Sequence, residues 1–95
     1  MALFVLTCLD KPNALDLRMA TREAHLAYVR DNVGILKVAG PVLDAAGDMA
    51  GSLFIIEAES AEAVEAFSAA DPYRQAGLFA QVTVLPWKMT VGGFA

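Results

Sequence analysis

The chain has very few of the residues that build disulfide frameworks and metal centres. Its 95 residues include one cysteine, Cys8, and one histidine, His25. A single cysteine cannot form an internal disulfide, and its place inside an apolar run predicts a reduced, buried thiol. One cysteine and one histidine on different elements make no usual ligand set, so we expect no metal site.

Charged residues are also scarce, and positive charges are the scarcer kind. Charged residues make up 19% of the chain, with 7 Lys and Arg against 11 Asp and Glu, for a net charge of −4. Nucleic-acid binding needs a basic stripe, whereas the few basic residues here are scattered. No apolar run reaches the roughly 18 residues that span a bilayer, and no basic region precedes the first apolar run as in a secretory signal. We therefore expect a cytoplasmic protein with neither a nucleic-acid nor a membrane partner.

Apolar residues, in contrast, are in excess. They make up 57% of the chain, compared with about 45–50% in typical soluble domains. A chain of this length builds one core and not two, so we expect residues 1–95 to form a single domain. A small domain has proportionally much surface to cover, and the apolar excess therefore favours a subunit interface.

The apolar runs and turn residues predict a βαββαβ order of elements. The strands are expected at Ala2–Leu9, Ile35–Val38, Ser52–Ala58 and Leu78–Trp87, the helices at about Ala14–Val33 and from Ser60 to Asp71-Pro72, and turns at 39–41, 43–50 and 73–77. This order predicts an α+β, ferredoxin-like subunit with both helices on one face of the sheet. Because the first, third and last strands are apolar on both faces, we expect the other face to form a sheet-on-sheet homodimer.

The first predicted helix carries a charge where burial is expected. Four apolar residues fall within about 60° of one another at 100° per residue and predict its buried stripe: Leu15, Leu26, Val29 and Val33. Arg22 lies at the centre of that stripe, and an unpaired buried charge is costly. Three explanations are open. A structural carboxylate pairs with Arg22, its guanidinium reaches an edge of the protein, or it faces a cavity that binds an anionic ligand.

His25 and Asp71 are the candidates for acid–base chemistry. Both lie on helices expected to pack on the same sheet face, and Asp71 stands where the second helix ends before Pro72. A carboxylate at a helix C-terminus is disfavoured by the helix dipole, so its presence needs a reason. Either Asp71 starts a local Asp-Pro turn through a hydrogen bond, or it orients His25 for proton transfer. The spacing leaves both readings open.

Several motifs together resemble the YciI-like family. They are R-E-A-H-L-A-Y at 22–28, A-G-P at 39–41 and D-P-Y-R-Q-A-G-L-F at 71–79, with an early D-K-P and a late L-P-W. The match covers nearly the whole chain in the same order. The resemblance implies a dimeric α+β barrel of ferredoxin-like subunits, similar to muconolactone isomerases and small cofactor-free monooxygenases. It also implies an Asp–His active-site pair, which falls on His25 and Asp71, with Arg22 and Pro41 in the same cleft. A characterised relative acts in dehydrochlorination of a chlorinated hydroquinone, without a metal.

The leading hypothesis is a small cofactor-free enzyme of the lyase or isomerase type, for example dehydrochlorinase-like. His25 would act as general base or acid, oriented by Asp71, because imidazole exchanges protons near neutral pH. Arg22 would hold an anionic or enolic oxygen of a small cyclic or carboxylated substrate, and Tyr73 could place a hydroxyl in the pocket beside Pro41. The alternatives are a non-catalytic dimeric module that binds a small ligand, or a cofactor-free monooxygenase.

Overall fold

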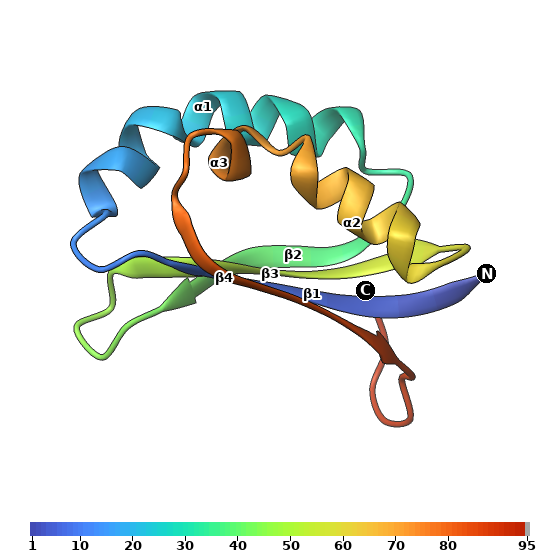
Figure 1. The fold of residues 1–95 in the computed structure, drawn as a ribbon. Helices are drawn as coiled ribbons and strands as arrows, with labels where there is room; N and C mark the ends of the chain where they lie inside the picture. Colours follow the sequence, from blue (N-terminus) through green and yellow to red (C-terminus); the bar gives the residue numbers. More distant parts are fainter. Residues whose placement is uncertain (95) are drawn as a thin grey trace.

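The protein is a four-stranded antiparallel sheet with its helices on one face (Figure 1), seen in a computed structural model that describes residues 1–94. The strands are β1 (Ala2–Asp10), β2 (Leu36–Leu43), β3 (Met49–Ala58) and β4 (Phe79–Trp87), and the helices are α1 (Leu15–Asp31), α2 (Ala61–Ala69) and α3 (Pro72–Gln75). The strands lie side by side in the order β2-β3-β1-β4. This arrangement confirms the predicted ferredoxin-like α+β fold. α3 replaces part of the turn expected at 73–77.

The core lies between the sheet and the helices. Successive residues of a strand face opposite sides, and the alternate residues Phe4, Leu6 and Cys8 of β1 point toward the helices and are buried. The buried apolar cluster consists of Phe4, Leu6, Cys8, Phe54, Ile56, Ala58, Val64 and Phe67. Cys8 is a buried free thiol, as predicted. Burial and the nearby negative charge of Asp71 raise the pKa of Cys8 to about 12, so it remains a neutral thiol at physiological pH.

The opposite face of the sheet is apolar and is covered by none of the helices (Figure 1). Val5 pairs with Ile55 on one side and with Leu85 on the other, so these three side chains share this face. Its exposed large apolar side chains are Leu9, Val38, Leu53, Leu85 and Trp87. β1, β3 and β4 therefore all place apolar side chains on this face, as expected, although β4 also places Gln81 and Thr83 there. None of the helices of the described chain lies over this face (Figure 1).

β2 is longer than the predicted strand. The sequence predicts that Ala39-Gly40-Pro41 ends it, and this is wrong, because β2 continues to Leu43 with Pro41 opposite Ser52 of β3. β2 is an edge strand, where one side of the backbone has no strand to pair with, so a proline is tolerated. The extension places residues 39–41 beside β3, at the cavity described below.

α1 presents a different side to the sheet than the sequence predicts. Leu15 and Val33 of the expected stripe are exposed, Val33 to 62%, while the buried residues of the helix are Arg18 and His25. At 100° per residue, the centre of the two buried residues lies roughly 65° from the centre of the expected stripe. The prediction fails because both buried polar side chains are hydrogen-bonded to carboxylates, which makes their burial tolerable.

Candidate active site

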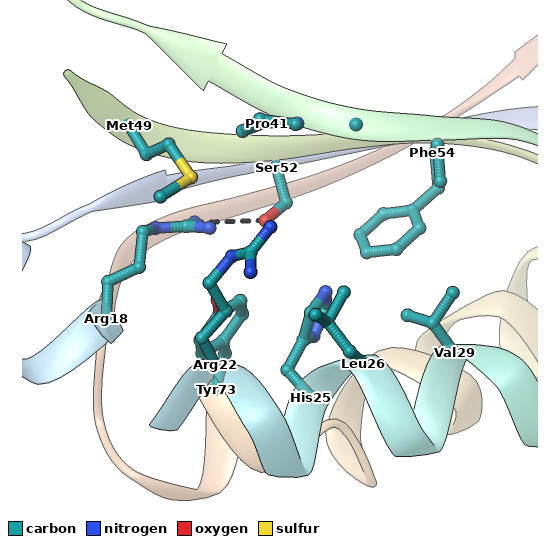
Figure 2. A pocket seen from close by; sticks show the side chains of 12 residues that line it. Arg18, Arg22, His25, Leu26, Val29, Pro41, Met49, Ser52, Phe54 and Tyr73 are labelled. Atoms are coloured by element: carbon teal, nitrogen blue, oxygen red, sulfur yellow. Dashed lines mark hydrogen bonds between the residues drawn. The ribbon is translucent and has the colours of Figure 1, made fainter. Parts of the chain in front are cut away.

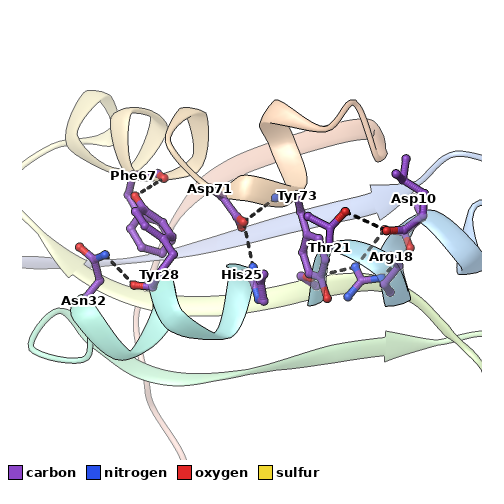
Figure 3. A network of polar contacts seen from close by, with 11 residues as sticks. Asp10, Arg18, Thr21, His25, Tyr28, Asn32, Phe67, Asp71 and Tyr73 are labelled. Atoms are coloured by element: carbon purple, nitrogen blue, oxygen red, sulfur yellow. Dashed lines mark hydrogen bonds and ion pairs between the residues drawn. The ribbon is translucent and has the colours of Figure 1, made fainter. Parts of the chain in front are cut away.

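His25 of α1 and Asp71, which precedes α3, lie in direct contact (Figure 3). His25 Nδ1 is 2.8 Å from Asp71 Oδ1, and the two residues are only 8% and 1% exposed. An ionised carboxylate can only accept, so Nδ1 carries the hydrogen and donates it. In the neutral imidazole Nε2 then holds the lone pair, and it is the ring nitrogen left for a reaction. This arrangement can accept a proton and return it.

Asp71 owes its position to the start of α3. α2 ends at Ala69, and Asp71 is the N-cap of the next helix, where its Oδ1 also accepts the Tyr73 N–H at 2.9 Å. The expected unfavourable interaction of Asp71 with a helix dipole is therefore wrong, because a helix N-terminus favours a carboxylate. The local turn and the contact with His25 were alternatives in the sequence. In the structure they occur together, on one oxygen.

Tyr73 packs against the imidazole and restricts the plane of its ring. The ring centroids of Tyr73 and His25 are 4.0 Å apart with an interplanar angle of 17°. Phe54 contacts the imidazole edge-on, with centroids 6.2 Å apart. Burial raises the pKa of the Tyr73 hydroxyl, which therefore stays neutral. With Nδ1 held by Asp71 and one ring face held by Tyr73, His25 is preorganised in a single orientation.

Arg18 is the buried arginine of α1, and its charge is paired. Its Nε and Nη2 donate to the two carboxylate oxygens of Asp10 at 2.7 and 2.9 Å, and Nη2 also donates to Ser52 Oγ at 3.0 Å. The guanidinium carbon lies 4.4 Å from the Tyr73 ring centroid. Burial acts to lower the pKa of Arg18, but the hydrogen bonds and charge of Asp10 outweigh it, so the pKa is raised and the cation is retained.

Arg22, one turn further along α1, is exposed, so its predicted place in a buried stripe is wrong. Among residues 1–94 no carboxylate forms an ion pair with its guanidinium. The structural carboxylate proposed for Arg22 is instead found at Arg18. Figure 2 shows the Arg22 side chain extending from α1 toward β3 beside the cavity. Arg22 is therefore placed to meet an anion entering that cavity.

A cavity of about 180 Å³ lies between α1 and the β2–β3 side of the sheet (Figure 2). Its apolar walls include Leu26, Val29, Pro41, Met49 and Phe54, and its polar groups are Arg18, Arg22, His25, Ser52 and Tyr73. Four of the predicted site residues thus line one cavity, while Asp71 contacts His25 from outside the lining. Apolar walls with a few convergent polar groups are typical of a small-molecule site.

The sequence did not single out Asp10, Arg18 or Ser52 as site residues. Arg18 gave a weak signal, since it stands one turn before Arg22. Ser52 gave none, because it reaches the site through strand pairing. It lies opposite Cys8 of β1, near the strand end that carries Asp10.

The fold and the site define a class, the ferredoxin-like α+β proteins with a cavity between the first helix and the sheet. The YCII-related domain matches residues 2–88, and the chain belongs to this family. It is 39% identical over 94 residues to protein YciI of Escherichia coli O6:H1. This match covers 90% of this chain and 96% of that protein. The resemblance noted in the motifs is thereby confirmed.

Solved structures give the same classification. The chain is 40% identical, with a TM-score of 0.88, to 5-chloro-2-hydroxyhydroquinone dehydrochlorinase (TftG) from Burkholderia phenoliruptrix AC1100 in complex with 2,5-dihydroxybenzoquinone. The match covers 93% of this chain and 95% of that chain. An antibiotic biosynthesis monooxygenase is 16% identical with a TM-score of 0.57, covering 96% of this chain and 100% of that chain, and shares the fold alone.

Two further features concern metals and membranes. Within residues 1–94, no three His, Cys, Asp or Glu side chains gather in a group that could hold a metal ion. In the same part of the chain, no helix combines the length and the apolar character needed to cross a membrane.

Proposed function

We propose that this chain is a small-molecule enzyme in which His25, oriented by Asp71, transfers protons to and from a single-ring substrate. The observation that carries the proposal is the 2.8 Å contact between the two side chains at a cavity that the imidazole lines. The 40% identity to a dehydrochlorinase supports the reaction class. Arg22 would bind an anionic or enolic oxygen, and Pro41 and Tyr73 would contact the substrate ring.

In the proposed reaction, His25 first carries a proton from one hydroxyl of the substrate to the ring carbon that bears chlorine, so that this hydroxyl becomes a carbonyl and the carbon becomes tetrahedral. His25 Nε2 then takes a proton from a second hydroxyl, whose electron pair forms a second carbonyl and shifts a ring double bond toward that carbon. Chloride leaves with the electron pair of its C–Cl bond, and the ring gains a double bond. The products are HCl and the unsaturated ring compound, so neither an oxidant nor a reductant is consumed. Asp71 stabilises the imidazolium that forms, because its carboxylate accepts the Nδ1 hydrogen throughout.

The proposal is tested with 5-chloro-2-hydroxyhydroquinone, the compound in the name of TftG. The purified chain is incubated with it without oxygen, and chloride release is followed by ion chromatography beside product absorbance. We expect chloride and product in equal amounts, at a rate well above that in buffer. If neither this compound nor other halogenated hydroquinones release chloride, while 2,5-dihydroxybenzoquinone binds, the non-catalytic ligand-binding module is the better description.

We also infer that the chain acts as a homodimer through the uncovered sheet face. Burial of about 800 Å² of largely apolar surface per subunit would give a gross gain of roughly 20 kcal/mol per subunit, from which association costs are subtracted. Leu85 lies within this face and is 54% exposed. Leu85→Lys should convert a dimer into a monomer in light-scattering measurements. Leu17→Lys, on the exposed side of α1, should leave the dimer intact. A monomeric wild-type chain at micromolar concentration would contradict the inference.

A further inference from the structure

We propose that Ser52 is a ligand-binding residue, which together with Arg22 forms a subsite for a negatively charged oxygen carried directly on a ring. The proposal deepens the proposed function and rests on it, because it names the ligand class of the same cavity. Ser52 belongs to neither the His25–Asp71 pair nor the residues expected from the sequence.

The hydrogen-bond pattern of Ser52 leaves its hydroxyl hydrogen free. Ser52 is 3% exposed and accepts a hydrogen bond from Arg18 Nη2 at 3.0 Å. A guanidinium has no acceptor, so the serine O–H cannot point back at Arg18. No acceptor for this O–H is found within residues 1–94. Figure 2 shows the Ser52 oxygen pointing from β3 toward α1, into the cavity that Ser52 lines.

The buried Asp10–Arg18 pair fixes this orientation. Asp10 holds the guanidinium through two hydrogen bonds, and Arg18 is 2% exposed, so the Nη2 that meets Ser52 cannot turn away. Donation by a cation also polarises the hydroxyl, which strengthens it as a donor. Asp10 and Arg18 are therefore positioning residues, and the O–H of Ser52 is the group that they present to a ligand.

The charge at this end of the cavity favours an anion. Asp10 neutralises Arg18, whereas Arg22 has no ion-pair partner within residues 1–94. One positive charge therefore remains uncompensated beside the Ser52 hydroxyl, and both groups can donate to an oxygen placed between them. The asymmetry of one hydroxyl donor and one guanidinium suits a single oxyanion better than a carboxylate, which pairs with an arginine through two oxygens.

The size and the walls of the cavity set the rest of the ligand. A cavity of roughly 150 Å³ accommodates benzene, and this one measures about 180 Å³. It therefore takes one six-membered ring with one or two small substituents. The ring would lie against Leu26, Pro41 and Phe54, which are apolar, and beside His25. The geometry thus assigns the site to monocyclic phenolates or enolates.

The test is the binding of 4-nitrophenolate and of its uncharged analogue nitrobenzene, measured by calorimetry at a pH at which the phenol is ionised. We expect Ser52→Ala to weaken 4-nitrophenolate binding roughly 10- to 100-fold, as for a lost hydrogen bond to a charged group. Nitrobenzene binding should not change. Ser68→Ala is the matched control, since Ser68 is also buried and also accepts from an arginine, Arg74 at 3.1 Å, but does not line the cavity. It should leave both affinities unchanged.

Three outcomes would overturn the proposal. In the first, Ser52→Ala weakens both probes equally, which would mean that the serine only supports packing. In the second, benzoate binds more tightly than 4-nitrophenolate and is insensitive to Ser52→Ala, which would make this a carboxylate site. In the third, the wild-type chain binds nitrobenzene more tightly than 4-nitrophenolate. This comparison needs no variant, so the test remains decisive if Ser52→Ala does not fold.

Because the readout is binding, it separates this proposal from the proposed reaction. Binding of 4-nitrophenolate that depends on Ser52, in a chain that releases no chloride, would leave the subsite in place and remove the dehydrochlorination. If instead the chain releases chloride while Ser52→Ala leaves its affinity for 4-nitrophenolate unchanged, that result would keep the dehydrochlorination and remove the subsite.

Discussion

Replacing His25 with asparagine should lower the rate of chloride release by about 10²- to 10⁴-fold, the usual contribution of a positioned general acid or base. Asparagine can still offer an N–H to Asp71 near the place of Nδ1, but it has no counterpart of Nε2. The variant therefore removes the proposed base while it keeps a partner for the buried carboxylate. The loss should appear in kcat, with a smaller change in KM, because the contact is needed in the transition state.

Two controls accompany this variant. Circular dichroism and light scattering should show an unchanged fold and assembly, since a collapse of either would mark His25 as a structural residue. Asp71→Asn should also be slower than the wild type, because an amide oxygen can still accept the Tyr73 N–H but cannot compensate an imidazolium charge. If His25→Asn turns over as fast as the wild type, His25 is not the acid–base group and the proposed mechanism is refuted.

The fold could be predicted because its strands coincide with apolar runs that turn residues bound in the sequence. β1 and β4 begin and end within a residue of their predicted bounds. The end of β2 could not be predicted, because Gly40-Pro41 indicates a turn in any strand that forms hydrogen bonds to neighbours on both sides. Only the order of strands in the sheet reveals that β2 is an edge and can continue through the proline.

The site could be predicted in part for a related reason. His25 and Asp71 stand out in the sequence as the single histidine and as an aspartate before a proline. The inner side of α1 could not be predicted, because an apolar stripe is a guide only where buried side chains are apolar. Arg18 is buried through partners on two strands, Asp10 and Ser52, and only the pairing of β1 with β3 brings these together. For the same reason, the apolar stripe predicted that Arg22 is buried, whereas the buried arginine is Arg18.

Replacing Asp10 with alanine should lower the free energy of unfolding by about 3–5 kcal/mol, the usual cost of leaving one member of a buried ion pair without its partner. The side chains of Arg18 and Asp10 are 2% and 5% exposed, so water cannot take over the role of the carboxylate. The measurement is urea unfolding followed by circular dichroism at one fixed protein concentration, since any assembly would add to the apparent stability.

The chain supplies a matched control in Glu65 and Arg74, an ion pair of 3.0 Å whose side chains are about one third to one half exposed. Glu65→Ala should cost less than about 1 kcal/mol, because solvent screens an exposed pair and hydrates the arginine that is left. The double variant Asp10→Ala/Arg18→Leu should recover much of the stability lost in Asp10→Ala, since it removes the stranded charge as well. Equal costs for Asp10→Ala and Glu65→Ala would mean that Arg18 finds another partner or reaches water. In that case the cation would no longer be fixed against Ser52, and the orientation of the serine hydroxyl would lose its physical basis.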